Sequence, residues 1–163
     1  MTLVRRLARP LMSSIFIHGG INALKSAEGH AQMAEPVIDQ LQPTVHKATS
    51  PLPFDLDNKQ VVQVNGAVQI VGGLLLATNR VPRIASLALA GSLVPTTLAG
   101  HRFWEETDER TKSMQKIHFF KNLSILGGLL LASVDTEGQP GLAWRAKRRA
   151  REAREGIANL DPR

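Results

Sequence analysis

The 163-residue chain contains no cysteine and no tyrosine, and only 4% of its residues are aromatic. Without cysteine the chain forms no disulfide, supplies no thiolate nucleophile and offers no thiolate ligand to a metal. Any redox chemistry therefore needs a bound cofactor or a partner protein. The net charge of +6 invites a nucleic-acid interpretation, but that function is typical of a basic face with stacking aromatic side chains. We therefore expect no nucleic-acid partner.

Charge is absent from long stretches of the chain. A mean hydropathy of −0.09 and 21% charged residues resemble the averages of a soluble protein. The basic residues, however, gather near the N-terminus, in the turn at 79–83 and in the tail from Arg145 to Arg154. Between them lie four apolar segments, at 10–24, 61–78, 84–99 and 117–134. This segregation of charge predicts membrane spans rather than one mixed soluble core.

The four segments predict an all-α integral membrane four-helix bundle. A helix needs about 17 to 25 residues to cross the hydrocarbon core, so the shorter segments recruit flanking residues. We expect helices at about 8–25, 61–78, 82–101 and 115–134 in a transmembrane domain of residues 1–142, followed by a basic cytoplasmic tail at 143–163. Arg9 and Arg102 would then place their charges at the membrane interface by snorkelling.

The alternatives to four retained spans are a soluble helical bundle and a cleaved signal peptide. Helices of a soluble bundle keep a polar face, whereas the segments at 70–77 and 123–134 are apolar all round. A secretory signal peptide would need an uninterrupted apolar core, but His18, Gly19, Gly20 and Asn22 interrupt this one. We therefore interpret the first segment as a retained helix.

Topology follows from the basic segments, because short basic segments resist translocation. With four spans, the N-terminus, the 79–83 turn and the tail fall on one side, which predicts both termini in the cytoplasm (N-in/C-in). The long first loop at 25–60 is then extracytoplasmic, and its three lysines against five carboxylates make it slightly acidic. We expect short helices in this loop, broken at Pro36 and Pro43.

Polar side chains inside the spans are the candidate binding residues, since such groups are expensive in a membrane. On each helix they share a face, and with the predicted topology they lie in the outer half of the bundle. We expect a polar chamber there, with Glu105 or Glu106 neutralising Lys121. The candidate ligand-binding residues are His18, Asn22, Asn65, Gln69, His101, Arg102, Glu105, His118, Lys121 and Asn122.

The competing interpretation of these residues is interhelical hydrogen bonding, at about 0.6 kcal/mol for each bond. The pattern leaves both interpretations open. His101 and Glu105 lie four residues apart, which permits a metal site with His118 or His18 without requiring one. We predict no catalytic residue and no metal site. GGLLLA occurs at 72–77 and again at 127–132, which fits either a duplicated hairpin or close helix packing within or between chains.

Several runs resemble the DoxX family of bacterial membrane proteins, in its actinobacterial branch. They are RPLMSSIFIHGGINAL, AEPVIDQL, VNGAVQIVGGLLLAT, LALAGSLVPTTLAGHRFWEE and IHFFKNLSILGGLLLASVDTEG. The resemblance implies a four-helix bundle in the bacterial plasma membrane, associated with quinol oxidase or thiosulfate:quinone oxidoreductase systems. It brings no catalytic residue to a position in this chain. Related bundles with cysteine pairs carry out thiol chemistry, and this chain departs from them.

Three functions follow as hypotheses. The first is a non-catalytic membrane subunit or scaffold of a redox membrane complex, which is not an enzyme by itself. The second is a quinone or small-lipid binding protein that uses the polar chamber. The third is a small transporter or proton path, which the apolar inner halves of the second and fourth spans disfavour. The expected partners are membrane lipids, a redox enzyme and a second copy of the chain.

Overall fold

The computed structural model describes residues 3–49, 56–136, 144 and 147–152. All regular structure in these residues is helical, which confirms the all-α class. The five long helices are α1 (Leu3–Lys25), α2 (Ala27–Thr49), α3 (Asn58–Ala77), α4 (Pro82–Gly100) and α5 (Glu109–Val134). Most of the predicted tail at 143–163 lies outside the described residues, apart from Trp144 and the helical residues 147–152.

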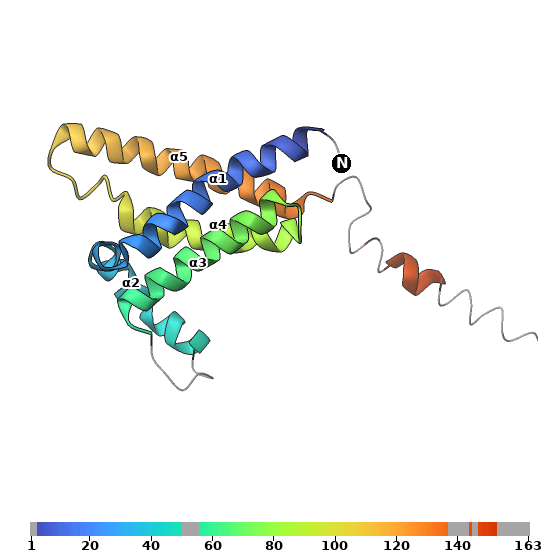
Figure 1. The fold of residues 1–163 in the computed structure, drawn as a ribbon, viewed down its shortest axis with the longest axis horizontal. Helices are drawn as coiled ribbons and strands as arrows, with labels where there is room; N and C mark the ends of the chain where they lie inside the picture. Colours follow the sequence, from blue (N-terminus) through green and yellow to red (C-terminus); the bar gives the residue numbers. More distant parts are fainter. Residues whose placement is uncertain (1–2, 50–55, 137–143, 145–146, 153–163) are drawn as a thin grey trace, which may run out of the picture.

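The helices α1, α3, α4 and α5 run side by side along the long axis of the molecule (Figure 1). α1 packs mainly on α3, α3 also contacts α4, and α4 contacts α5. α2 lies at one end, where α1 finishes and α3 begins, and it packs against α3 and α4. We call this end the α2 end. The start of α1 and the finish of α5 meet at the opposite end.

The starts of α3 and α5 are set by capping residues. Asp57 accepts a hydrogen bond from the Gln60 backbone N–H, and the Gln60 side chain accepts one from the Asp57 backbone N–H. This capping box satisfies two N–H groups that the helix itself leaves unpaired. Asp108 caps α5 by accepting from the Thr111 N–H. α5 therefore begins at Glu109, six residues before the predicted start at about 115.

The long first loop differs from the expectation. Instead of short pieces broken at Pro36 and Pro43, the structure has one helix, α2, that runs through both prolines. Both prolines lie on exposed positions, so the carbonyl groups that lose their helical partners face outward. The opposite side of α2 places Val37 and Ile38 in the interior. This packing holds the helix together across the proline positions.

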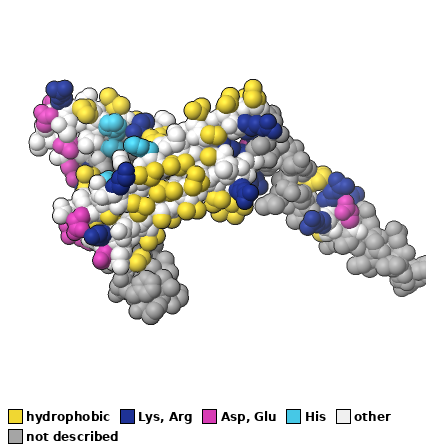
Figure 2. All heavy atoms as spheres, viewed as in Figure 1, with side chains coloured by type: hydrophobic (Ala, Val, Ile, Leu, Met, Phe, Trp, Pro, Cys, Tyr) yellow, Lys and Arg dark blue, Asp and Glu magenta, His cyan; other side chains and the backbone are white. Residues whose placement is uncertain are grey.

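The surface of the bundle is strongly apolar along its middle. Figure 2 shows hydrophobic side chains covering the centre of the visible face, with charged side chains concentrated toward the two ends. α3 and α5 are long and apolar enough to cross a membrane, with mean hydropathies of 1.4 and 1.5. Only 33% and 11% of their apolar windows are buried. A soluble protein would cover such helices, so these faces are suited to lipid.

The α1–α3 interface depends on glycine. A Cβ atom at Gly20 would lie 2.5 Å from the Gly66 carbonyl oxygen, and one at Gly73 would lie 2.8 Å from Ile17 Cγ1. Small residues allow helix backbones to approach closely in membrane bundles. Gly91 and Gly127, by contrast, have open space around them. The predicted packing role of glycine therefore holds within the chain at Gly73, while a role for Gly127 between chains stays a prediction.

Among the described residues, the interior contains two apolar clusters. The central cluster includes Phe16, Leu76, Leu89 and Leu129, one each from α1, α3, α4 and α5. The second cluster lies at the α2 end and joins α1, α2 and α3. The central cluster separates the polar groups near the α2 end from those at the other end of the bundle, because its members lie between them along each helix.

Candidate functional site

The predicted polar face of α3 bonds to α4. Gln69 is buried, and its Nε2 donates to Ser92 Oγ at 3.1 Å and to Thr96 Oγ1 at 3.3 Å. Asn65, one turn earlier, donates from Nδ2 to the same Thr96 Oγ1 at 3.2 Å. Thr96 in turn donates to the Ser92 carbonyl oxygen. The two predicted amides therefore connect α3 to α4 through hydroxyl groups, as interhelical bonds do in membrane bundles.

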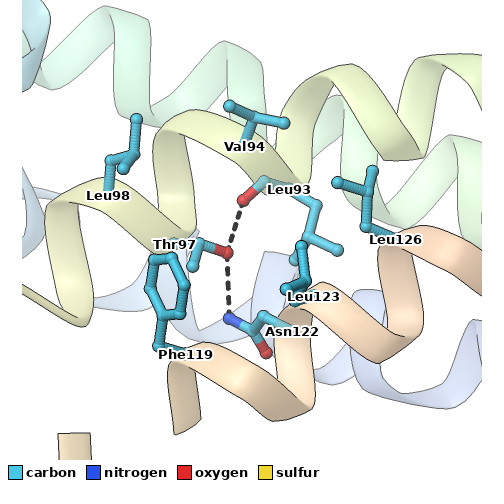
Figure 3. Close-up of a pocket in the computed structure, with 8 residues that line it drawn as sticks. All are labelled: Leu93, Val94, Thr97, Leu98, Phe119, Asn122, Leu123 and Leu126. Atoms are coloured by element: carbon cyan, nitrogen blue, oxygen red, sulfur yellow. Dashed lines mark hydrogen bonds between the residues drawn. The ribbon is translucent and has the colours of Figure 1, made fainter. Parts of the chain in front are cut away.

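Asn122 forms the corresponding link between α5 and α4. Its side chain is buried, and Nδ2 donates to Thr97 Oγ1 at 3.1 Å. Thr97 Oγ1 donates onward to the Leu93 carbonyl oxygen at 2.7 Å, and Figure 3 shows this chain of bonds. The hydroxyl group of Thr97 thus has both a donor and an acceptor partner.

A groove of about 100 Å³ lies over this pair, between α4 and α5. Thr97 and Asn122 are its polar residues, and its other walls are apolar (Figure 3). The lining residues are Leu93, Val94, Thr97, Leu98, Phe119, Asn122, Leu123 and Leu126. Small-molecule sites commonly measure about 300 to 1,000 Å³. The groove therefore fits one portion of an amphipathic ligand, such as a chain segment or a ring edge.

The two histidines near the start of α5 are in contact. The rings of His101 and His118 stack with centroids 5.2 Å apart and an angle of 24° between their planes. His101 Nδ1 lies 2.7 Å from Gln115 Oε1, and because an amide oxygen only accepts, this nitrogen carries the proton. Lys121 Nζ lies 3.4 Å from His118 Nδ1. The ammonium group donates there, so His118 Nδ1 is the acceptor.

The remaining candidates lie at the surface of the α2 end. His18 and Asn22 are exposed on α1, with Asn22 Nδ2 3.5 Å from His18 Nε2. Arg102 forms an ion pair with Glu105 at 3.3 Å. We expect Glu105 or Glu106 to neutralise Lys121, but Glu105 pairs instead with Arg102, which is three residues away and easier to reach. The ten predicted residues are thus distributed among interhelical links, a histidine pair and the surface.

An aromatic cluster adjoins the histidine pair. Phe103, Trp104 and Phe119 contact one another edge to face, with ring centroids 5.2 to 5.9 Å apart. Trp104 is half exposed. Trp side chains are enriched where a protein meets the membrane–water interface. The segment at 101–106 therefore has the character of an interfacial anchor.

The other end of the bundle contains a charged cluster that the sequence interpretation did not identify. Arg5 binds Asp135 through two bonds, Nε to Oδ2 at 2.7 Å and Nη2 to Oδ1 at 2.9 Å. Arg9 Nη2 donates to Asp135 Oδ2 at 3.1 Å. Arg83 Nη2 donates to the Val134 carbonyl oxygen at 3.2 Å, at the C-terminus of α5. We call this group, Arg5, Arg9, Arg83 and Asp135, the arginine end.

The buried position of the Arg9 side chain contradicts a prediction. We expected it to snorkel to the interface, but its side chain is only 4% exposed. The reason is Asp135, whose carboxylate supplies a partner within the bundle, so the guanidinium group does not need to reach water. The sequence signal was a lone aspartate directly after a long uncharged run of α5, at the height where α1 carries its arginines.

These features define an all-helical membrane protein, with apolar faces outward and polar side chains paired between its helices. A model of the DoxX family matches residues 5–102, more than half of the chain, and the chain belongs to the DoxX family. The match covers α1 to α4 and ends at Arg102, before α5. No curated protein and no solved structure matches the chain.

Proposed function

We propose that this DoxX protein is a non-catalytic membrane subunit or scaffold of a redox membrane complex. The observation that carries the proposal is the pairing of the interior polar groups. Gln69 and Asn122, which a membrane catalyst or carrier would use, donate to hydroxyl groups of neighbouring helices. They act as links between helices, so the surfaces left for interaction are at the ends of the bundle.

The α2 end is the proposed docking surface. It presents Trp104 and Glu105 at exposed positions, and α2 adds a polar outer face above the second apolar cluster. Aromatic side chains are enriched where proteins bind one another, so Trp104 is the expected anchor of this surface. The redox context comes from the family resemblance, and a chain without cysteine supplies no thiol chemistry of its own, so in this proposal the partner carries the redox group.

The test is native mass spectrometry of the full chain extracted with its lipids in nanodiscs. We expect a protein that carries a redox cofactor to co-elute in fixed stoichiometry. Replacing Trp104 by Ala together with Glu105 by Lys should reduce its recovery by at least tenfold, while Met114→Ala, also at an exposed position, should not. Recovery of the wild-type chain alone under all extraction conditions would overturn the scaffold proposal.

A second candidate function is binding of a quinone or small lipid. The groove over Thr97 and Asn122 favours it, since its apolar walls suit the hydrocarbon part of such a ligand. Lys121 and His118 lie within one turn of Asn122 along α5. Ligand recovery should fall when Leu98→Trp fills the groove and persist in Leu130→Trp, whose position is exposed elsewhere on the bundle. Equal recovery from both variants would exclude the groove.

A transporter or proton path has less support. The central apolar cluster of Phe16, Leu76, Leu89 and Leu129 lies between Gln69 and the arginine end. A proton path needs a chain of titratable or polar groups, and this cluster interrupts such a chain among the described residues.

A further inference from the structure

Pro95 leaves one backbone carbonyl group of α4 without its helical partner. In an α-helix, each carbonyl oxygen accepts a hydrogen bond from the N–H four residues later, and proline has no N–H to donate. Pro95 lies inside α4, so the carbonyl oxygen of Gly91 loses this bond. Gly91 lies halfway along α4, at an exposed position. A carbonyl group without a donor is costly at this depth, because the hydrocarbon core of a membrane has no water to bind it.

The two carbonyl groups that follow Gly91 each receive a bond from a side chain. Thr96 Oγ1 donates to the Ser92 carbonyl oxygen at 2.7 Å. Thr97 Oγ1 donates to the Leu93 carbonyl oxygen at the same distance, 2.7 Å. In the part of the chain that the structure describes, no side chain donates to the Gly91 oxygen in this way. The donor that this oxygen needs is therefore one that the described helices do not supply.

The Gly91 carbonyl group adjoins the apolar groove between α4 and α5. It points along the helix axis toward the turn of Val94 and Leu98, which line the groove (Figure 3). The spacing of these three residues places them on one face of α4. On α5, Gly127 is exposed and follows the lining residue Leu123 by one turn. A Cβ atom at either glycine would meet no atom within 4 Å, so there is space for a ligand beside the oxygen.

Water, an acyl chain and a second copy of the chain are poor partners for this oxygen. A buried water makes about three hydrogen bonds, whereas the groove walls are apolar, and an acyl chain has no donor. A second copy would present Ser14, halfway along α1, or Ser124, near Gly127 on α5. Each of these hydroxyl groups already donates to a carbonyl oxygen of its own helix. A small apolar molecule with its own hydroxyl group meets both requirements.

We propose that the groove binds a neutral lipophilic phenol, whose hydroxyl group donates to the Gly91 carbonyl oxygen and whose hydrocarbon body lies on the groove walls. Phe119 in these walls suits an aromatic ring, which it can contact edge to face. The inference rests on the second candidate function, ligand binding in the groove, and defines the class of ligand. A ligand with acceptors alone, such as an oxidised quinone, places oxygen against oxygen and lacks this bond.

The test compares para-nonylphenol with its methyl ether, each titrated at matched mole fraction into the full-length chain in mild detergent and followed by native mass spectrometry. The two probes share an apolar body, but only the phenol has a hydroxyl donor. A hydrogen bond made in an apolar place is worth about tenfold in affinity, so we expect the phenol to bind about tenfold more tightly than the ether. Equal binding of the two probes to the wild type would overturn the proposal.

Pro95→Ala tests whether the Gly91 oxygen is the acceptor. The alanine supplies an N–H that donates to this oxygen within α4, so the preference for the phenol should disappear while binding of the ether stays unchanged. Pro82→Ala is the matched control, because Pro82 is the first residue of α4, where an N–H has no helical partner. The preference should persist in this control. A preference that survives in Pro95→Ala would overturn the assignment.

Substitutions in the groove separate this inference from the function on which it rests. Gly91→Leu fills the space beside the oxygen and should weaken both probes about tenfold, while Gly100→Leu, in open space at the end of α4, should not. If Leu98→Trp removes both probes but the wild type binds them equally, the groove binds ligands and only the hydroxyl selection fails. If Leu98→Trp leaves both bound, ligand binding in the groove fails as well. A dimer that Gly91→Leu dissociates, with equal binding of the probes, would assign this face to a second copy and overturn the proposal.

Discussion

α1 is attached to the rest of the bundle in two different ways along its length. In its second half, glycine lets its backbone approach that of α3, with Gly20 against Gly66. At its beginning, Arg5 and Arg9 attach it to the end of α5 through Asp135. The first contact depends on shape and the second on charge. Shape holds α1 irrespective of salt and pH, whereas a charged contact needs every partner in its ionised state.

The difference matters most when one partner of the charged contact is removed. In Asp135→Asn, Arg5 and Arg9 each lose the ion pair with the Asp135 carboxylate, while the Arg9 side chain stays buried. Breaking a buried ion pair from one side destabilises by about 3 to 5 kcal/mol. Because Asp135 is 25% exposed, we expect the lower end, about 3 kcal/mol, measured by unfolding in mixed detergent micelles without anionic lipid. A variant as stable as the wild type would show that the ion pairs are not needed.

The contact based on shape is broken by a single methyl group. In Gly20→Ala the new Cβ meets the Gly66 carbonyl oxygen at 2.5 Å, and a backbone atom cannot rotate away. Overpacking of this kind costs about 1 to 3 kcal/mol, so we expect about 2 kcal/mol in the same unfolding assay. Gly91→Ala is the matched control, because its Cβ meets no atom within 4 Å. Equal effects at both glycines would contradict the close approach.

Much of the fold could be predicted from the sequence, because charge and apolar residues are segregated along the chain. The apolar runs locate α3 and α4 to within three residues of their ends. α2 was less predictable. The rule that proline breaks helices is local, whereas the burial of Val37 and Ile38 that keeps α2 continuous depends on the whole bundle.

In the candidate site, too, residues that stand out within their own helix could be predicted, whereas pairings between distant parts of the chain could not. Gln69 and Asn122 stand out because amides in an apolar helix need partners. Ser92 does not stand out, since its hydroxyl group can bond within its own helix. The pairing of Arg9 with Asp135 joins residues 126 positions apart. Only the arrangement of α1 beside α5 reveals that pairing.

The neutral links between the helices are expected to contribute less than either attachment of α1. In Gln69→Leu, the bonds to Ser92 and Thr96 are lost, but Thr96 still donates to the Ser92 carbonyl oxygen. Interhelical hydrogen bonds in membrane proteins contribute about 0.6 kcal/mol each, so we expect a loss of about 1 kcal/mol. Gln63→Leu, at an exposed position of the same helix, is the control. A loss as large as that of Gly20→Ala would indicate that the polar layer does more than link helices.

The smallest effect on stability is expected from loss of the Asp108 cap, a charged contact outside the membrane-spanning region. The N–H and hydroxyl groups of Thr111 donate to its carboxylate and hold the pKa of Asp108 below its ordinary value of 3.8. A lowered pKa in the folded state means that the cap stabilises the start of α5 fully above pH 3.8 and loses this contribution as the pH falls through the folded value.

Hydrogen exchange of the Thr111 amide measures the Asp108 cap directly. Protection, after correction for the intrinsic exchange rate, should be constant from neutral pH down to the ordinary pKa of Asp108 and decrease below it. In Asp108→Ala the amide should be poorly protected at every pH, because no carboxylate accepts its bond. Protection that is independent of pH in the wild type would show that the Asp108 charge does not hold this turn. The charged contact at Asp108 would then behave like the shape-based contact between α1 and α3.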